Sequence, residues 1–125
     1  MTKILIVDDE PLIRYSLVKT LTHDWTAVTA VTNGKDALSE IHSASYDICF
    51  LDVQLPDANG LDLMKIVHDV SPATRIVIMT AGSLDDEQLH SLRSQGCYFF
   101  PKPFNLDEAQ TLVAQIASQP LAGEA

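Results

Sequence analysis

Short apolar runs alternate with stretches of helical periodicity along the sequence, and this alternation constrains the fold more than any other feature. Residues 48–51 (ICFL) and 76–79 (IVIM) are apolar at every position rather than at every second one. Continuous runs of this kind are typical of parallel strands that helices cover on both faces. The alternation of strands with helices in turn indicates a parallel sheet between two layers of helices.

Five strands and five helices are predicted on this basis. The predicted strands are residues 3–7, 26–31, 48–51, 76–79 and 97–100. Apolar residues at helical spacing mark a helix after each strand, and the first such stripe is Ile13, Leu17 and Leu21. Pro11 fits the first turn of that helix, with Asp9 as its expected N-cap.

The other helices show boundary signals of their own. Asn33 and the glycine after it predict a turn or cap before the second helix. The fourth helix is predicted over 84–94 and closes at Gly96, a typical C-terminal glycine. Asn105 is the expected cap of a last helix over 106–118.

The length and composition suit one globular domain, expected over residues 1–119 of the 125. Residues 120–125 are expected to form a disordered tail or the start of a linker. Hydrophobic residues make up 46% of the chain, which is enough to build a core. Cys49 and Cys97 lie in apolar runs without Cys-x-x-Cys spacing, and this indicates buried, reduced thiols rather than a disulfide.

The formal net charge of -9, from 17 acidic and 8 basic side chains, limits the partners of this domain. An acidic surface disfavours nucleic acid and anionic membranes, whereas it accommodates cations and basic partners. No apolar run approaches membrane-spanning length, and the short apolar run at the N-terminus does not fit a signal peptide. We therefore expect a soluble cytoplasmic protein.

Chemically active side chains stand where the predicted strands end. Asp8 and Asp9 follow the first strand, Asp52 the third, Thr80 the fourth, and Lys102 comes shortly after the fifth. Ligands of open α/β sheets bind at the carboxyl ends of the strands, so these groups should converge. Three carboxylates suit a hard cation such as Mg²⁺, and a hydroxyl and an ammonium beside it suit a phosphoryl group.

Four motifs, "VDDEP", "DVQLPDANG", "VIMTA" and "PKPF", together resemble the receiver domain of two-component response regulators. They fall in the order and spacing of that family, and the resemblance covers essentially the whole chain. It implies a flavodoxin-like α/β fold, with a doubly wound five-stranded parallel sheet of order 2-1-3-4-5 and five helices. It also implies a signalling module that catalyses only its own phosphotransfer and autodephosphorylation.

The resemblance assigns Asp52 as the phosphoacceptor, which a sensor histidine kinase or a phosphotransfer protein would phosphorylate with Mg²⁺ as cofactor. Asp9 would bind Mg²⁺ directly and Asp8 more loosely, through water. Asp52 itself and the backbone carbonyl of Gln54 would complete the protein ligands. This set of roles agrees with what phosphoryl transfer requires, namely positioning and charge neutralisation.

Switching residues follow from the same resemblance. Thr80 would hydrogen-bond the phosphoryl oxygen and move towards it, while Lys102 would form an ion pair with it. Phe99 would be the aromatic residue that turns inward, acting by packing alone because it has no hydroxyl. The family usually has a cis bond at the position of Lys102 and Pro103, so this bond is a candidate cis peptide.

The resemblance also predicts which residues control dephosphorylation and which face contacts partners. The side chain of Gln54 and the small Ala81 are the expected determinants of the dephosphorylation rate. The fourth helix, last strand and last helix would form the face that contacts an output domain or a second copy in a homodimer. The chain would be either a stand-alone receiver or the N-terminal part of a larger, transcriptional regulator. The last helix contains no Lys or Arg, which weighs against dimerisation through charged pairs.

Three other functions compete with this hypothesis. A pseudo-receiver would be a constitutive interaction module, although such domains typically lose one of the residues that are intact here. A phosphatase of the haloacid dehalogenase type would need a second Asp at the position of Gln54. A flavodoxin-like carrier of FMN would need a Gly-rich phosphate loop after the first strand, which is absent from this sequence. Taken singly, Asp52, Thr80 and Lys102 could each be ordinary residues at the ends of strands.

Overall fold

Five parallel strands alternate with five helices over residues 1–118, which are the residues that this computed structural model describes. The elements are β1 (Thr2–Val7), α1 (Pro11–Leu21), β2 (Thr26–Val31), α2 (Gly34–Ser43), β3 (Ile48–Asp52), α3 (Gly60–Val70), β4 (Arg75–Thr80), α4 (Asp86–Ser94), β5 (Tyr98–Pro101) and α5 (Leu106–Ser118). The sheet order is β2-β1-β3-β4-β5, which confirms the predicted fold class. The expected tail, 120–125, lies outside the described residues.

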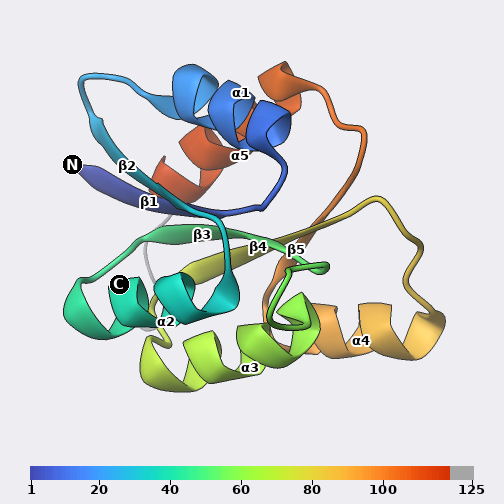
Figure 1. Cartoon of the computed structure of the whole chain (residues 1–125). Coiled ribbons are helices and arrows are strands. Elements are labelled where there is room, and N and C mark those ends of the chain that lie inside the picture. The colour runs from blue at the N-terminus through green and yellow to red at the C-terminus, as the bar shows by residue number, and fades with distance from the viewer. Residues whose placement is uncertain (119–125) are drawn as a thin grey trace.

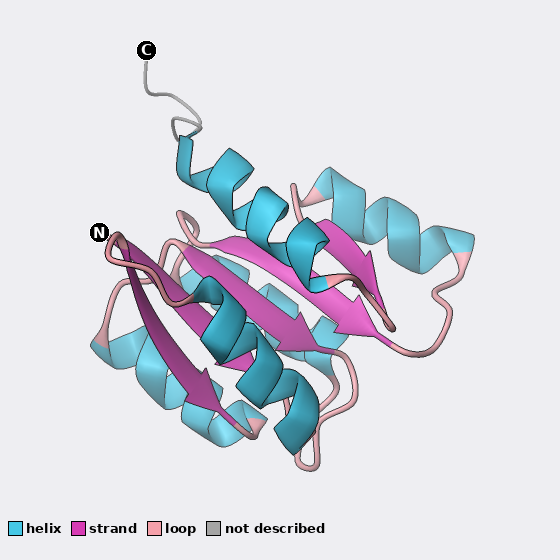
Figure 2. Ribbon diagram, turned by 90° about the horizontal axis from the view of Figure 1, so that it is seen from above, coloured by secondary structure: helices cyan, strands magenta, loops and turns pink. Residues whose placement is uncertain are grey.

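The helices form two layers on opposite faces of the sheet (Figure 1). Helices α1 and α5 cover one face, and their buried side chains pack on Ile4, Ile6 and Phe50. Helices α2, α3 and α4 cover the other face and pack on Leu5 and Leu51. Figure 2, seen from above, shows the first of these layers lying over the sheet, with its helices running roughly along the strands. Every residue of β3 is buried, as its continuous apolar run predicts for a central strand.

The start of α1 differs from the prediction. Pro11 is the first helical residue, but the N-cap is Glu10 rather than Asp9, and the Glu10 side chain makes no capping hydrogen bond. The ring of a proline disfavours helical backbone in the residue before it, and Glu10 accordingly has an extended conformation. The helix begins at Pro11, so its N-cap is the residue directly before it, Glu10. The prediction of Asp9 as the N-cap was wrong.

The other predicted caps are confirmed. The side chain of Asn33 accepts a hydrogen bond from the amide of Asp36 at 2.8 Å, at the start of α2. Asn105 accepts one from the amide of Asp107 at 2.8 Å, at the start of α5. Gly96 has a φ of 72° after the end of α4, a conformation that favours glycine. Helix α4 begins at residue 86 instead of 84, because Asp85 and Gln88 form a capping box there.

No helix among the described residues has both the length and the apolar character needed to span a bilayer.

The two cysteines are free, as the sequence predicts. Cys49 of β3 pairs with Ile76 of β4, and the residue after Cys97 pairs with the residue after Ile76. The Cα atoms of the two cysteines therefore lie about two strand spacings apart, which is about 9–10 Å and exceeds the Cα–Cα reach of a disulfide, about 7 Å. Burial raises the pKa of Cys49 to about 12 and that of Cys97 to about 11, so both remain thiols at neutral pH.

The loop between β3 and α3 folds tightly back on the end of β3. The amide of Gly60 donates a hydrogen bond to the carbonyl of Val53 at 2.7 Å. A Cβ at residue 60 would collide with the carbonyl oxygen of Asp52 and would lie only 2.7 Å from the Cα of Val53. Only glycine therefore allows this approach between the first turn of α3 and the backbone at Asp52.

Replacing Gly60 with alanine should destabilise the protein, because the added methyl group forces the loop away from β3. We expect a loss of about 1–3 kcal/mol in the free energy of unfolding, measured by urea denaturation. Gly82→Ala is the control, since the nearest atom to its added Cβ, the hydroxyl oxygen of Thr80, is at 3.5 Å. The control should change stability by no more than about 0.5 kcal/mol. Equal effects of the two variants would contradict the close approach at Gly60.

Candidate functional site

The parallel sheet brings the predicted polar residues to one edge. Asp8 directly follows β1, Asp52 ends β3, Thr80 ends β4 and Lys102 directly follows β5. These strands are neighbours in the sheet, so their carboxyl ends lie side by side. Asp8, Asp52 and Thr80 are buried, with exposed fractions of 0%, 3% and 3%. Polar groups are rarely buried without a partner or a ligand, which makes this edge the candidate functional site.

The ammonium group of Lys102 lies at the centre of this site. Its Nζ is 3.0 Å from Oδ2 of Asp8, 3.1 Å from Oε1 of Glu10 and 3.2 Å from Oδ2 of Asp52. The side chain of Lys102 is almost fully buried. One positive charge thus holds together three negative charges, two from the connection between β1 and α1 and one from the end of β3.

Glu10 is a site residue that sequence reasoning missed. The sequence motif contains it as the third acid of "DDE", but only the first two were assigned a role. Its side chain is about half exposed and approaches Lys102 from the start of α1. The only sequence signal was its adjacency to the two aspartates, which does not tell where the side chain points.

The three carboxylates form a group that suits a cation. One oxygen each of Asp8, Glu10 and Asp52 lie within 4.8 Å of one another. The Oδ1 atom of Asp8 accepts a hydrogen bond from the amide of Glu10 at 2.9 Å. Its Oδ2 atom is buried and has only the ion pair with Lys102, without a hydrogen bond. The site has three carboxylates against one ammonium, so its net charge is negative. A buried carboxylate oxygen in such a site suits a hard divalent cation such as Mg²⁺.

Asp9 lies apart from this group of carboxylates. Its side chain is exposed, and none of its oxygens belongs to the three that lie within 4.8 Å. The structure therefore brings together two of the predicted metal ligands, Asp8 and Asp52, and leaves the third, Asp9, at the surface.

The main chain of Gln54 contacts the carboxylate of Asp52. The amide of Gln54 donates a hydrogen bond to Oδ1 of Asp52 at 3.2 Å, while its side chain is exposed. Because Lys102 holds Oδ2 and Gln54 holds Oδ1, the carboxylate of Asp52 has a fixed orientation. Gln54 itself is held in a short antiparallel bridge with Asn59 across the loop.

The hydroxyl of Thr80 lies at the end of β4 beside the exposed Ala81. Its Oγ1 atom accepts a hydrogen bond from the amide of Gly82 at 3.0 Å. Its carbonyl accepts one from the amide of Lys102 at 2.8 Å, which ties the end of β4 to the segment after β5. The peptide bond between Lys102 and Pro103 is cis, as predicted.

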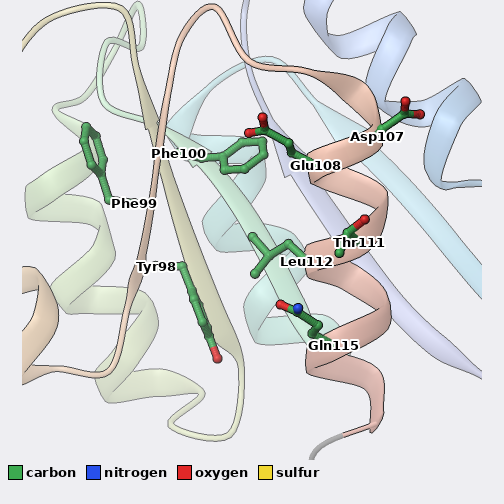
Figure 3. Close-up of a pocket in the computed structure, with 8 residues that line it drawn as sticks. All are labelled: Tyr98, Phe99, Phe100, Asp107, Glu108, Thr111, Leu112 and Gln115. Carbon is green, nitrogen blue, oxygen red and sulfur yellow. The ribbon is translucent and has the colours of Figure 1, made fainter.

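Phe99 lies on the opposite face of β5 from its neighbours in sequence. Its partly buried ring packs with the core of α2, α3 and α4, whereas Phe100 and Tyr98 pack with the core of α1 and α5. Figure 3 shows the Phe99 ring directed away from α5 and the Phe100 ring directed towards it. Phe99, the predicted switch residue, thus lies on the face of the sheet that α4 covers.

The environment of Asp52 opposes its ionisation. Burial raises the pKa of Asp52 to about 6, and the negative charge of Asp8 adds to this effect. The charge of Lys102 and the hydrogen bond from Gln54 act in the opposite direction without cancelling it. Burial alone would lower the pKa of Lys102, but its bonds with Asp8 and Glu10 outweigh burial and raise that pKa.

Ionised Asp52 should therefore destabilise the metal-free fold. Its pKa is about 6 in the folded state, against about 3.9 in an unfolded chain. The folded state binds more protons between these values, so the free energy of unfolding should fall as pH rises from 4 to 6. Asp52→Asn removes this effect and should be more stable than wild type by about 1–3 kcal/mol above pH 7 in EDTA. The advantage should vanish below about pH 3, where Asp52 is protonated in both states.

Urea denaturation as a function of pH measures this difference. Asp24→Asn, which changes an exposed aspartate of the loop between α1 and β2, is the matched control. An advantage of Asp52→Asn that does not depend on pH would contradict the electrostatic explanation.

Comparisons with known proteins agree with this geometry. The chain matches the response regulator receiver domain family over residues 4–114. The DNA-binding transcriptional regulator NtrC of Proteus hauseri is 32% identical over 108 residues, which are 86% of this chain and 23% of NtrC. The chain spans about a quarter of the length of this and the next curated relatives it matches.

Two solved structures show the same likeness in three dimensions. A two-component response regulator from Clostridium difficile is 31% identical with a TM-score of 0.86, over 95% of this chain and 98% of that one. The response regulator TrrA of Thermotoga maritima, solved in complex with Mg²⁺-BeF, is 30% identical with a TM-score of 0.77, over 93% and 99% of the two chains. The family match includes every residue of the acidic group and Lys102. The chain belongs to the response regulator receiver domain family.

Proposed function

We propose that this domain accepts a phosphoryl group on Asp52 from a sensor histidine kinase or a phosphotransfer protein, with Mg²⁺ as cofactor. The observation that carries the proposal is the buried carboxylate of Asp52, oriented by the ammonium of Lys102 at 3.2 Å within a group of acids. A pseudo-receiver would not need to keep this costly arrangement of buried charge.

The residues of the site would supply positioning and charge neutralisation. An oxygen of Asp52 would form a bond to phosphorus while the bond from phosphorus to the imidazole nitrogen of the donor breaks, and the imidazole takes up a proton. Lys102 would pair with the incoming phosphoryl oxygens, and the amide of Gln54 keeps the carboxylate oriented. Phosphoryl transfer requires little else from the protein, because its loose transition state is stabilised mainly by opposite charge.

Mg²⁺ would be held by Asp9 directly and by Asp8 through water, together with Asp52 and the backbone carbonyl of Gln54. The buried Oδ2 of Asp8, which has an ion pair with Lys102 but no hydrogen bond, and the excess of negative charge support a cation here. Asp9 joins the set on family resemblance alone, since its carboxylate is exposed. When bound, Mg²⁺ supplies positive charge to the phosphoryl oxygens. The TrrA complex with Mg²⁺-BeF supports the choice of cation.

Thr80 and Phe99 are the proposed switch residues. The hydroxyl of Thr80 accepts from Gly82 and still has its own proton to donate to a phosphoryl oxygen. Phe99 would move inward as Thr80 moves, and its contribution would be packing because the ring has no polar atom. Gln54 and Ala81, both exposed beside Asp52 and Thr80, are the proposed determinants of dephosphorylation because they border the path of an attacking water.

The proposed output face comprises α4, β5 and α5. A groove of about 430 Å³ lies on this face between β5 and α5. Figure 3 shows the residues that line it. Its lining includes the apolar Tyr98, Phe100 and Leu112 and, at one end, the acidic Asp107 and Glu108. An output domain or a second copy of the chain would bind here. The sequence of α5 contains no basic residue, so a symmetric pairing through α5 alone would bring like charges together.

Incubation with acetyl phosphate and Mg²⁺ tests the proposed function. Intact mass spectrometry should detect one phosphoryl group on the wild-type protein, because Asp52 is the nucleophile that the site orients. The adduct should be absent from Asp52→Asn and from a sample with EDTA, while the control Asp24→Asn should be modified like wild type.

An unmodified wild-type protein that also shows no spectral change with beryllofluoride would contradict the proposal and favour a constitutive interaction module.

A further inference from the structure

An aspartate outside the acidic group links the loop between β3 and α3 to another helix. The Oδ1 atom of Asp57 accepts a hydrogen bond from the amide of Gly34 at 2.7 Å. Its Oδ2 atom accepts one from the amide of Lys35 at 3.0 Å. Gly34 and Lys35 are the first residues of α2, so both carboxylate oxygens bind the N-terminus of that helix. These hydrogen bonds hold the pKa of Asp57 below its usual range, and the link is intact at neutral pH.

Helix α2 does not depend on Asp57 for its own cap. Asn33 already caps the helix locally, through the bond from the amide of Asp36. The contact of the loop with the helix is also close, because a Cβ at Gly34 would lie 3.0 Å from the Cβ of Ala58. Asp57 therefore adds a connection between two segments rather than a missing cap.

The other end of the same loop contacts the phosphoacceptor. Gln54 donates its amide to Asp52 and pairs with Asn59, and the amide of Leu55 donates to the carbonyl of Ala58 at 3.2 Å. The loop is thus held at Asp52 on its inner side and at α2, through Asp57, on its outer side. Movement of Asp57 would be transmitted over a few residues to the main chain of Gln54.

We infer that Asp57 is a positioning residue for the divalent-cation site, because it fixes the loop that presents the backbone of Gln54 beside Asp52. The inference rests on the proposed function of the site. A carbonyl ligand that is already in place binds a cation more tightly than one that must first be ordered. Asp57 touches neither the cation nor the phosphoryl group, so it acts only through the geometry of the loop.

Three variants separate positioning from helix capping. Asp57→Ala removes the link to α2, and Asp57→Asn keeps one acceptor oxygen in the same place. Asn33→Ala is the matched control, since it removes a cap from the same helix but leaves Asp57 in contact with Gly34 and Lys35. Each variant is titrated with Mg²⁺ alone by amide NMR, and amide hydrogen exchange is measured on the metal-free protein.

Asp57→Ala should raise the Kd for Mg²⁺ roughly tenfold, the low end for groups that support metal ligands from outside the coordination sphere. It should also accelerate hydrogen exchange at the amides of Gln54 and Gly60. Asp57→Asn should lie between it and wild type, and Asn33→Ala should resemble wild type in both measurements.

An effect of Asp57→Ala no larger than that of Asn33→Ala, with wild type binding Mg²⁺ normally, would overturn the inference and leave the proposed function in place. A wild-type protein that binds no Mg²⁺ would overturn both.

Discussion

The ion pairs of Lys102 with three carboxylates are the interaction on which the rest of the site depends. Asp8 and Glu10 come from the connection after β1 and Asp52 from the end of β3, and without a cation among them their charges would repel across a few ångströms of largely buried space. One ammonium does not cancel the effects of burial and of the neighbouring charge of Asp8, so the pKa of Asp52 remains raised. The fold thus keeps a site with an excess of negative charge, which a divalent cation would offset.

The sheet makes this concentration of charge possible. Four neighbouring parallel strands end at one edge, so residues distant in sequence meet there without any long loop. The helices on both faces bury the apolar residues of β1 and β3, and Asp8 and Asp52 follow these apolar runs and are themselves buried. Gly60 has no side chain and so allows the loop after Asp52 to pack closely against β3. Asp57 connects the same loop to α2 through two hydrogen bonds. The same packing that stabilises the sheet therefore also orients the carboxylate.

The sequence was sufficient for the strands, the order of the elements and most of the site. Continuous apolar runs identify β3 and β4, and the residues after them, Asp52 and Thr80, follow from the general position of ligand sites in parallel sheets. Asp9 was wrongly predicted as the N-cap of α1, because Pro11 disfavours helical backbone in Glu10, and this effect outweighed the preference of aspartate for the N-cap position. Glu10 was omitted because the sequence does not tell whether a side chain at the start of a helix points towards the site or towards solvent. Asp57 was missed because its partners lie 22 and 23 residues away, and no local pattern encodes such a contact.

A crystal structure of the domain with Mg²⁺ and beryllofluoride tests the account most directly, because it locates every charge at the site at once. The account predicts beryllofluoride on a carboxylate oxygen of Asp52, Mg²⁺ beside Asp8 and Asp9 and in contact with the carbonyl of Gln54, and the ammonium of Lys102 bound to fluoride instead of Glu10. Unmodified Asp52 with Lys102 still bound to all three carboxylates would contradict it, because the acidic group would then be a closed ion-pair network rather than a site for phosphoryl transfer.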